Sequence, residues 1–213
     1  MDNIIEVHNV TKKFKELKAL DNISLEFERG KIHGIVGRNG SGKTVLFKCI
    51  CGFLKMDEGE ILVDGKRIGK EIEAPQDVGV IIENPGFLPS YNGYQNLNFL
   101  ACIRNKIKKK DILEVIERVG LDPKSKKRVG KYSMGMRQRL GIAQAIMENP
   151  SLLILDEPMN GLDNQGVQDM RKLFLNLKEE GKTIILASHN REDISVLCDT
   201  VAEMDHGQIL SRT

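Results

Sequence analysis

The sequence predicts an α/β fold built around a parallel sheet. Three short runs, at residues 78–82, 152–155 and 183–187, are β-branched or leucine-rich and show no polar alternation. Such runs are typical of central parallel strands that are covered on both faces. Between the last two, apolar residues recur at spacings of three and four over residues 167–177, as in an amphipathic helix. Strands alternating with helices indicate a layered α/β core.

The N-terminal part predicts an antiparallel β layer beside this core. Residues 4–7 suit a strand, and Ile23, Leu25 and Phe27 alternate with polar residues. A period of two is typical of half-buried antiparallel strands. An apolar run at 32–36 then leads into a glycine-rich turn, and a helix is expected from about residue 43 to 51.

The middle of the chain predicts an inserted helical subdomain. It shows helical segments at 94–104, 111–119 and 135–147 and no convincing strand. We therefore expect a single domain whose core spans about 1–85 and 150–213 and whose helical subdomain spans about 86–149.

Composition excludes several classes of protein. Lys and Arg total 32 against 30 for Asp and Glu, so no overall field favours nucleic acid as a partner. Basic runs at 106–110 and 124–131 predict solvated surface, with an anionic membrane surface or an acidic partner loop as alternatives. No apolar stretch is long enough to span a bilayer, and the first residues suggest no secretory signal, so a cytoplasmic protein is expected.

The four cysteines predict reduced thiols that serve as small packing residues. Their spacing lacks the pairs of a zinc site, and a cytoplasmic setting keeps thiols reduced. These residues are Cys49, Cys51, Cys102 and Cys198.

A phosphate-binding loop is the clearest motif. The pattern G-x-x-x-x-G-K-[ST] is matched without exception by Gly37, Arg38, Asn39, Gly40, Ser41, Gly42, Lys43 and Thr44. Glycines let backbone N–H groups approach phosphate oxygens, and the helix that follows directs its positive end to the same place. Lys43 would reach the β and γ phosphates of ATP, and the Thr44 hydroxyl would complete the shell of a bound Mg²⁺.

A second motif is an apolar strand that ends in two carboxylates, Asp156 and Glu157. Acidic groups at the end of a buried strand need a positive partner, and that end of such a sheet is where ligands bind. Asp156 is therefore predicted to anchor Mg²⁺, and Glu157 to act as the base that polarises the attacking water. A helix N-cap is the structural alternative.

The order of motifs resembles the nucleotide-binding subunit of ABC transporters over essentially the whole chain. The segment YSMGMRQRL at 132–140 resembles the signature of that family, and its Ser133 lies 23 residues before Asp156. The resemblance implies a P-loop NTPase (RecA-like) core, and it implies that Ser133 and Gly135 face the ATP held by a second ATPase subunit. A helix N-terminus is a natural anion site, although Ser133 would also suit a plain N-cap.

Further residues take their roles from the same resemblance. Asp163, in Asn-Gly-Leu-Asp, matches the loop that contacts the dimer partner. His189 matches the switch histidine that contacts the γ-phosphate. Phe14 matches the aromatic residue that stacks on adenine, with a core phenylalanine as the alternative.

The sequence departs from the family pattern at Glu83, where glutamine is usual. Glu83 could still lie near Mg²⁺, and Asn-Pro-Gly after it predicts a turn or hinge. Together with Met134 and Met136 in the signature and Asn-Gly before Leu162, it resembles the branch that serves export of, or self-protection against, bacitracin- and lantibiotic-like peptides.

The leading prediction is an ATPase that dimerises around two ATP molecules, identical chains or an unlike pair, and drives separate transmembrane permease subunits. It would lie in the cytoplasm, against the inner face of the membrane. The alternatives are a soluble ABC-type ATPase that acts on a non-membrane partner and a nucleotide sensor that does not hydrolyse ATP. No nucleic acid partner is expected.

Overall fold

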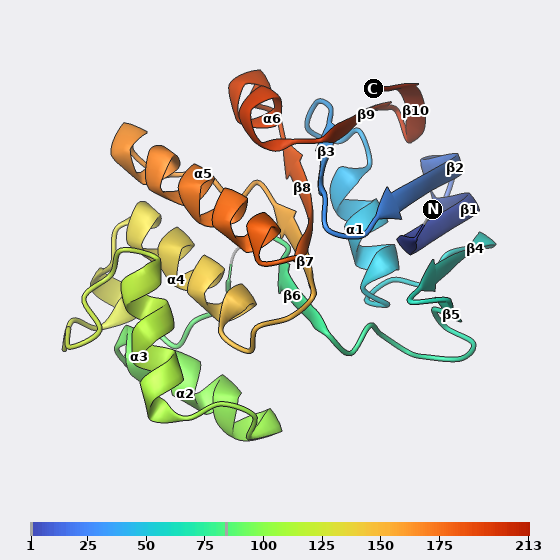
Figure 1. Cartoon of the computed structure of the whole chain (residues 1–213). Coiled ribbons are helices and arrows are strands. Elements are labelled where there is room, and N and C mark those ends of the chain that lie inside the picture. Colours follow the sequence, from blue (N-terminus) through green and yellow to red (C-terminus); the bar gives the residue numbers. More distant parts are fainter. Residues whose placement is uncertain (1, 84) are drawn as a thin grey trace.

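Two sheets organise the computed structural model, which describes residues 2–83 and 85–213 (Figure 1). The first is antiparallel, in the order β2-β1-β4-β5, and the second has the order β10-β9-β3-β8-β7-β6. The antiparallel sheet contains β1 (Asn3–Phe14), β2 (Leu17–Glu28), β4 (Glu58–Val63) and β5 (Lys66–Arg67). The strands of the second sheet are β3 (Ile32–Val36), β6 (Val78–Ile81), β7 (Leu152–Asp156), β8 (Thr183–Ser188), β9 (Thr200–Asp205) and β10 (Gln208–Arg212).

The second sheet confirms the predicted parallel core. Strands β9, β3, β8, β7 and β6 pair in parallel, and only β10 among the described strands of this sheet runs antiparallel to its neighbour. All six residues of β8 are buried, as expected for a strand that is covered on both sides.

Each face of this sheet has its own apolar cluster. Along β7, Leu153 and Leu155 pack with the helices that follow β6, whereas Leu152 and Ile154 pack with α1 (Lys43–Ile50) and the antiparallel sheet. The antiparallel layer is confirmed as well, since Ile23, Leu25 and Phe27 are buried and point into the second cluster.

The predicted middle helices are present between β6 and β7. They are α2 (Gly93–Arg104), α3 (Lys109–Arg118) and α4 (Met134–Ile146), with a 3₁₀ turn, η1 (Val129–Lys131), before α4. Figure 1 shows them gathered on one side of the parallel sheet, away from α1 and the antiparallel strands. In the described part of the chain, no helix has both the length and the apolar character needed to cross a bilayer.

The helix predicted between β7 and β8 is α5 (Asn164–Glu179), and a short α6 (Arg191–Leu197) follows β8. The sequence did not predict α6, β4, β5, β9 or β10. The expectation that the cysteines pack inside holds for Cys49 and Cys51, and Cys198 is half-buried, but it is wrong for Cys102. Cys102 lies on the exposed side of α2 because Leu97 and Ala101 form the buried side of that helix.

Candidate nucleotide site

The phosphate-loop segment folds as a cradle that Lys43 closes. The side chain of Lys43 is buried, and its Nζ donates to the carbonyl oxygens of Gly37 (2.7 Å) and Arg38 (3.1 Å). Gly42 has φ of 110° and precedes the first residue of α1. A Cβ atom at Gly42 would lie 2.5 Å from the Ala19 carbonyl oxygen, so glycine is required there for both conformation and space.

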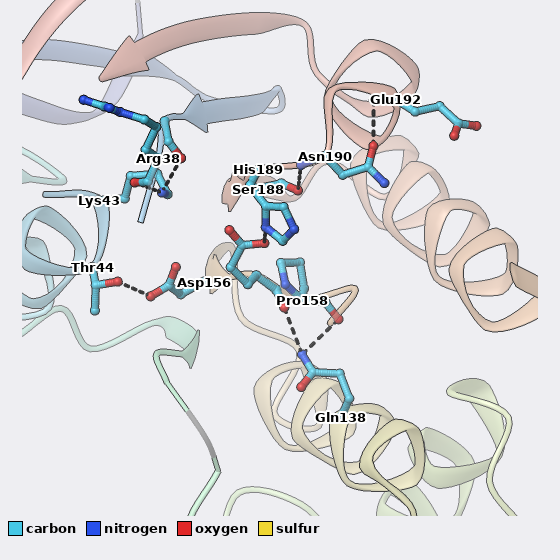
Figure 2. Close-up of polar contacts among 12 residues, drawn as sticks. Arg38, Lys43, Thr44, Gln138, Asp156, Pro158, Ser188, His189, Asn190 and Glu192 are labelled. Atoms are coloured by element: carbon cyan, nitrogen blue, oxygen red, sulfur yellow. Dashed lines mark hydrogen bonds and ion pairs between the residues drawn. The ribbon is translucent and has the colours of Figure 1, made fainter. Parts of the chain in front are cut away.

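Thr44 and Asp156 meet directly, although 112 residues separate them. The Thr44 hydroxyl donates to the Asp156 carboxylate at 2.6 Å, across from Lys43 (Figure 2). Both oxygens are hard ligands of the kind that Mg²⁺ prefers. The structure thus brings together Thr44 and Asp156, two of the three predicted metal ligands.

Glu157 and His189 form the second pair. Glu157 stands at the end of β7, with φ of 49°, and its Oε2 lies 2.9 Å from His189 Nδ1 (Figure 2). Its other oxygen, Oε1, is buried and has no hydrogen-bond partner among the described residues. The same is true of Ser41 Oγ in the loop. Orphaned buried oxygens of this kind fit a site whose ligand or water supplies the missing partners.

A cleft of about 1160 Å³ is lined by Ser41, Lys43, Thr44, Asp156 and Glu157 but not by His189, which reaches it through its contact with Glu157. Its lining includes the loop from Asn39 to Val45, then Asp156 and Glu157 at the end of β7, and Phe14 and Glu83 at the side. The volume and the convergence of polar groups suit a ligand of nucleotide size.

Phe14 is 45% exposed and lines this cleft, so the alternative of a core phenylalanine is wrong. The Lys12 ammonium lies 5.6 Å from its ring centroid. Because the ring is exposed in the cleft, a planar base can stack on the face that Lys12 leaves open.

Glu83 lines the cleft but binds elsewhere in this structure. Its carboxylate pairs with Lys48 of α1 at 2.6 Å, and its backbone has φ of 60°. Asn84, the first residue of the predicted hinge, lies outside the described residues. The described residues contain no group of three or more His, Cys, Asp or Glu side chains able to hold a metal. Magnesium fits such a site, because it usually takes one or two protein ligands together with phosphates and water.

Ser133, Gly135 and Asp163 lie outside the cleft of their own chain, whereas Met134, Arg137 and Gln138 of the signature segment line it. Ser133 is exposed and caps α4 by accepting from the Met136 N–H at 3.2 Å, which agrees with the plain N-cap reading. Asp163 caps α5 through the Gly166 N–H at 2.8 Å. Neither residue lines the cleft, nor does Gly135.

The phosphate loop is also held, at Arg38 and Ser41, by the end of β9 and the turn that follows it. The Gly207 N–H donates to the Ser41 carbonyl at 2.9 Å. The Arg38 side chain points out to Asp205, with Nη2 and Oδ1 3.0 Å apart, and this guanidinium lowers the pKa of that carboxyl. Arg38 and Gly37 thus contribute carbonyl oxygens to the cradle and do not line the cleft.

Sequence reasoning missed Gln138, a buried residue of α4. Its side-chain amide donates to the carbonyl oxygens of Pro158 (2.9 Å) and Glu157 (3.3 Å). Its place in the signature segment was visible in the sequence, but its partners were not.

Comparison with known proteins places these motifs together in one family. Residues 20–160 match the family described as "ABC transporter". The ABC transporter ATP-binding protein YybJ of Bacillus subtilis is 47% identical over 97% of this chain and 94% of its own length. The bacitracin transport ATP-binding protein BcrA of Bacillus licheniformis is 41% identical over 99% of this chain and 69% of its own length. The structure of cbiO1 from Clostridium perfringens, 29% identical, superposes with a TM-score of 0.84 over 100% of this chain and 88% of that one.

Proposed function

The chain belongs to the ABC transporter family and is an ATPase of that type, and from this premise we propose that two copies of the fold close around two ATP molecules to drive separate membrane subunits. The observation that carries the proposal is the cleft in which the Lys43 cradle faces Asp156, Glu157 and the exposed ring of Phe14. The predicted phosphate, metal, base and adenine groups of one chain line this cleft, and His189 adjoins it through Glu157.

Each residue has a definite task in this proposal. Loop N–H groups and Lys43 bind the phosphates, and Phe14 stacks on adenine. Thr44 and Asp156 would hold Mg²⁺, which supplies positive charge to the phosphate oxygens when it is bound. Glu83 would join them only after leaving Lys48.

Hydrolysis then depends on Glu157 and His189. The Glu157 carboxylate takes a proton from water as the water oxygen forms a bond to the γ-phosphorus, and the bond to the β–γ bridging oxygen breaks. His189 donates to Glu157 from 2.9 Å and so fixes the direction in which the carboxylate accepts.

The position of the signature supports the proposed dimer. Ser133 and Gly135 lie at the N-terminus of α4, where N–H groups and the helix dipole favour an anion. Since they do not line the cleft of their own chain, the phosphate they would bind belongs to a second copy or a close paralogue. Asp163, exposed at the start of α5, would contact the same partner.

The transported substrate is proposed to be an antimicrobial peptide of the bacitracin or lantibiotic type, which would make the chain part of a resistance system. The support is the similarity to BcrA, whose name assigns it to bacitracin transport. The cbiO1 structure is described as part of a transporter complex, cbiONQ, which supports separate membrane subunits and a place on the inner face of the membrane.

The dimer is tested with Glu157→Gln, which should bind ATP and Mg²⁺ and hydrolyse ATP only very slowly. Size-exclusion chromatography with light scattering should show the mass doubling when ATP is added. Ser133→Arg in the same background should remain monomeric while still binding ATP. A monomer at high concentration of Glu157→Gln with ATP would refute the dimer.

The membrane assignment is tested by affinity purification of the tagged chain from detergent-solubilised membranes. An integral membrane protein recovered in stoichiometric amount would support the transporter. Recovery of soluble partners alone would favour the soluble ATPase instead.

A further inference from the structure

Gln138 links the signature helix to the catalytic base of the same chain. The residue is 9% exposed, and its amide nitrogen contacts the main-chain oxygens of Glu157 and Pro158 (Figure 2). Both partners are carbonyl acceptors, so only the NH₂ end of the amide can face them. The orientation of this side chain is therefore determined by chemistry.

The backbone that Gln138 holds is the one that aims Glu157. With φ of 49°, Glu157 occupies the left-handed region, which costs free energy for any residue with a Cβ atom. Such a conformation persists only when its surroundings fix it. The Glu157 N–H donates to the Ala187 carbonyl at 2.9 Å, and the Glu157 carbonyl accepts from the Asn160 N–H at 3.1 Å as well as from Gln138.

The contact with Gln138 comes from a different part of the fold than the other two. Ala187 is in β8, and Asn160 is in the same turn as Glu157, whereas Gln138 belongs to α4. A small shift of α4 would therefore change the support of Glu157 without breaking the sheet.

We propose that Gln138 is a positioning residue for Glu157, and that it makes hydrolysis in one chain depend on the position of its own signature helix. This rests on the proposed function, in which Ser133 at the tip of α4 contacts the partner's nucleotide. Ser133 and Gln138 are about 8 Å apart along one rigid helix. Occupancy of the partner's ATP site is thereby coupled to the aim of the base in this chain.

The test uses Gln138→Met, which keeps the length of the side chain and removes both donors. Phosphate release by the full chain should show kcat reduced about 10- to 100-fold, because misplacing a base forfeits part of its contribution. The Kd for the fluorescent analogue TNP-ATP should change by less than about twofold, since Gln138 lines the cleft but directs its amide to the Glu157 and Pro158 carbonyls. Gln138→Glu, which also lacks the donors, should lose activity in the same way. It replaces Gln138→Met as the test variant if Gln138→Met folds poorly.

Gln144→Met is the matched control, because Gln144 lies on the same helix, is half-buried, and makes no side-chain hydrogen bond among the described residues. It should keep the wild-type kcat. The decisive measurement is single-turnover hydrolysis by Glu157→Gln with and without Gln138→Met. If Gln138 acts through Glu157, its replacement should cause no further loss in that background.

Three results would overturn the proposal. They are an unchanged kcat in Gln138→Met, an equal loss in Gln144→Met, and a full additional loss in the Glu157→Gln background. An inactive wild-type chain would overturn the proposed function as well, whereas an active wild type with any of these three results would leave the proposed function standing.

Discussion

Replacing Gly79 with alanine tests how tightly α4 packs on the parallel sheet. A Cβ atom at Gly79 in β6 would lie 1.9 Å from the Ala145 carbonyl oxygen and 2.7 Å from Leu153 Cδ2. Real Cβ atoms essentially never approach other atoms closer than 3.0 Å. The helix and the strand would therefore have to separate by about 1 Å at a close-packed contact.

The cost follows from what blocks the new methyl group. The nearer atom is part of the backbone and cannot rotate away, and Leu153 is 1% exposed and has no free space to enter. Overpacking of this kind costs about 1–3 kcal/mol, and we expect a loss of about 3 kcal/mol in the free energy of unfolding. Gly86→Ala is the control, because a Cβ atom there meets nothing within 4 Å.

Urea unfolding followed by circular dichroism measures both variants. Gly86→Ala should remain within about 0.5 kcal/mol of the wild type. The ATPase rate of Gly79→Ala should also fall, since the same helix carries Gln138. If Gly79→Ala were as stable as Gly86→Ala, the close contact between β6 and α4 would be refuted.

Three other predictions concern single groups. Phe14→Ala should raise the KM for ATP about tenfold with little change in kcat, as measured by phosphate release, and Phe14→Tyr should keep the wild-type KM. An unchanged KM in Phe14→Ala would remove Phe14 from the site. Ellman's reagent at pH 8 should modify Cys102 alone in the native chain and all four thiols after denaturation. The reason is that burial raises the pKa of Cys49 to about 11 and the pKa of Cys51 and Cys198 to about 12, and two rapidly reacting native thiols would contradict this. Burial lowers the pKa of His33, so below about pH 6.5 the unfolded chain binds this proton more readily than the folded chain, and the free energy of unfolding should decrease as the pH is lowered. His33→Gln should flatten this dependence in urea titrations, and an unaltered slope would exclude His33 as its source.

The central strands and middle helices could be predicted because their signal is local. Buried parallel strands such as β7 and β8 are uninterrupted apolar runs, and the middle helices were found within about two residues of their observed ends. Strands β4 and β10 were missed because they are short, partly exposed and rich in polar residues. Their strand conformation comes from pairing with β1 and β9, which the sequence does not display.

The candidate site shows the same division. The phosphate loop, Asp156 and Glu157 could be recognised because they lie at the ends of apolar strands, and His189 because it matches the family pattern; their roles stay predictions. The contacts of Gln138 with Glu157 and of Glu83 with Lys48 join segments 19 and 35 residues apart, and no local pattern encodes them. The roles of Ser133, Gly135 and Asp163 stay predictions, because they concern a partner chain.

The two apolar clusters on opposite faces of the parallel sheet have a consequence for how such a protein can diversify. Neighbouring side chains of one strand, such as Ile154 and Leu155, belong to different packing neighbourhoods. Repacking on the side of α2, α3 and α4 therefore leaves the surroundings of α1 and the phosphate loop largely undisturbed. Substitutions beneath α2 and α3 can therefore accumulate without reshaping the phosphate loop, whereas α4 is constrained by the contact of Gln138 with Glu157.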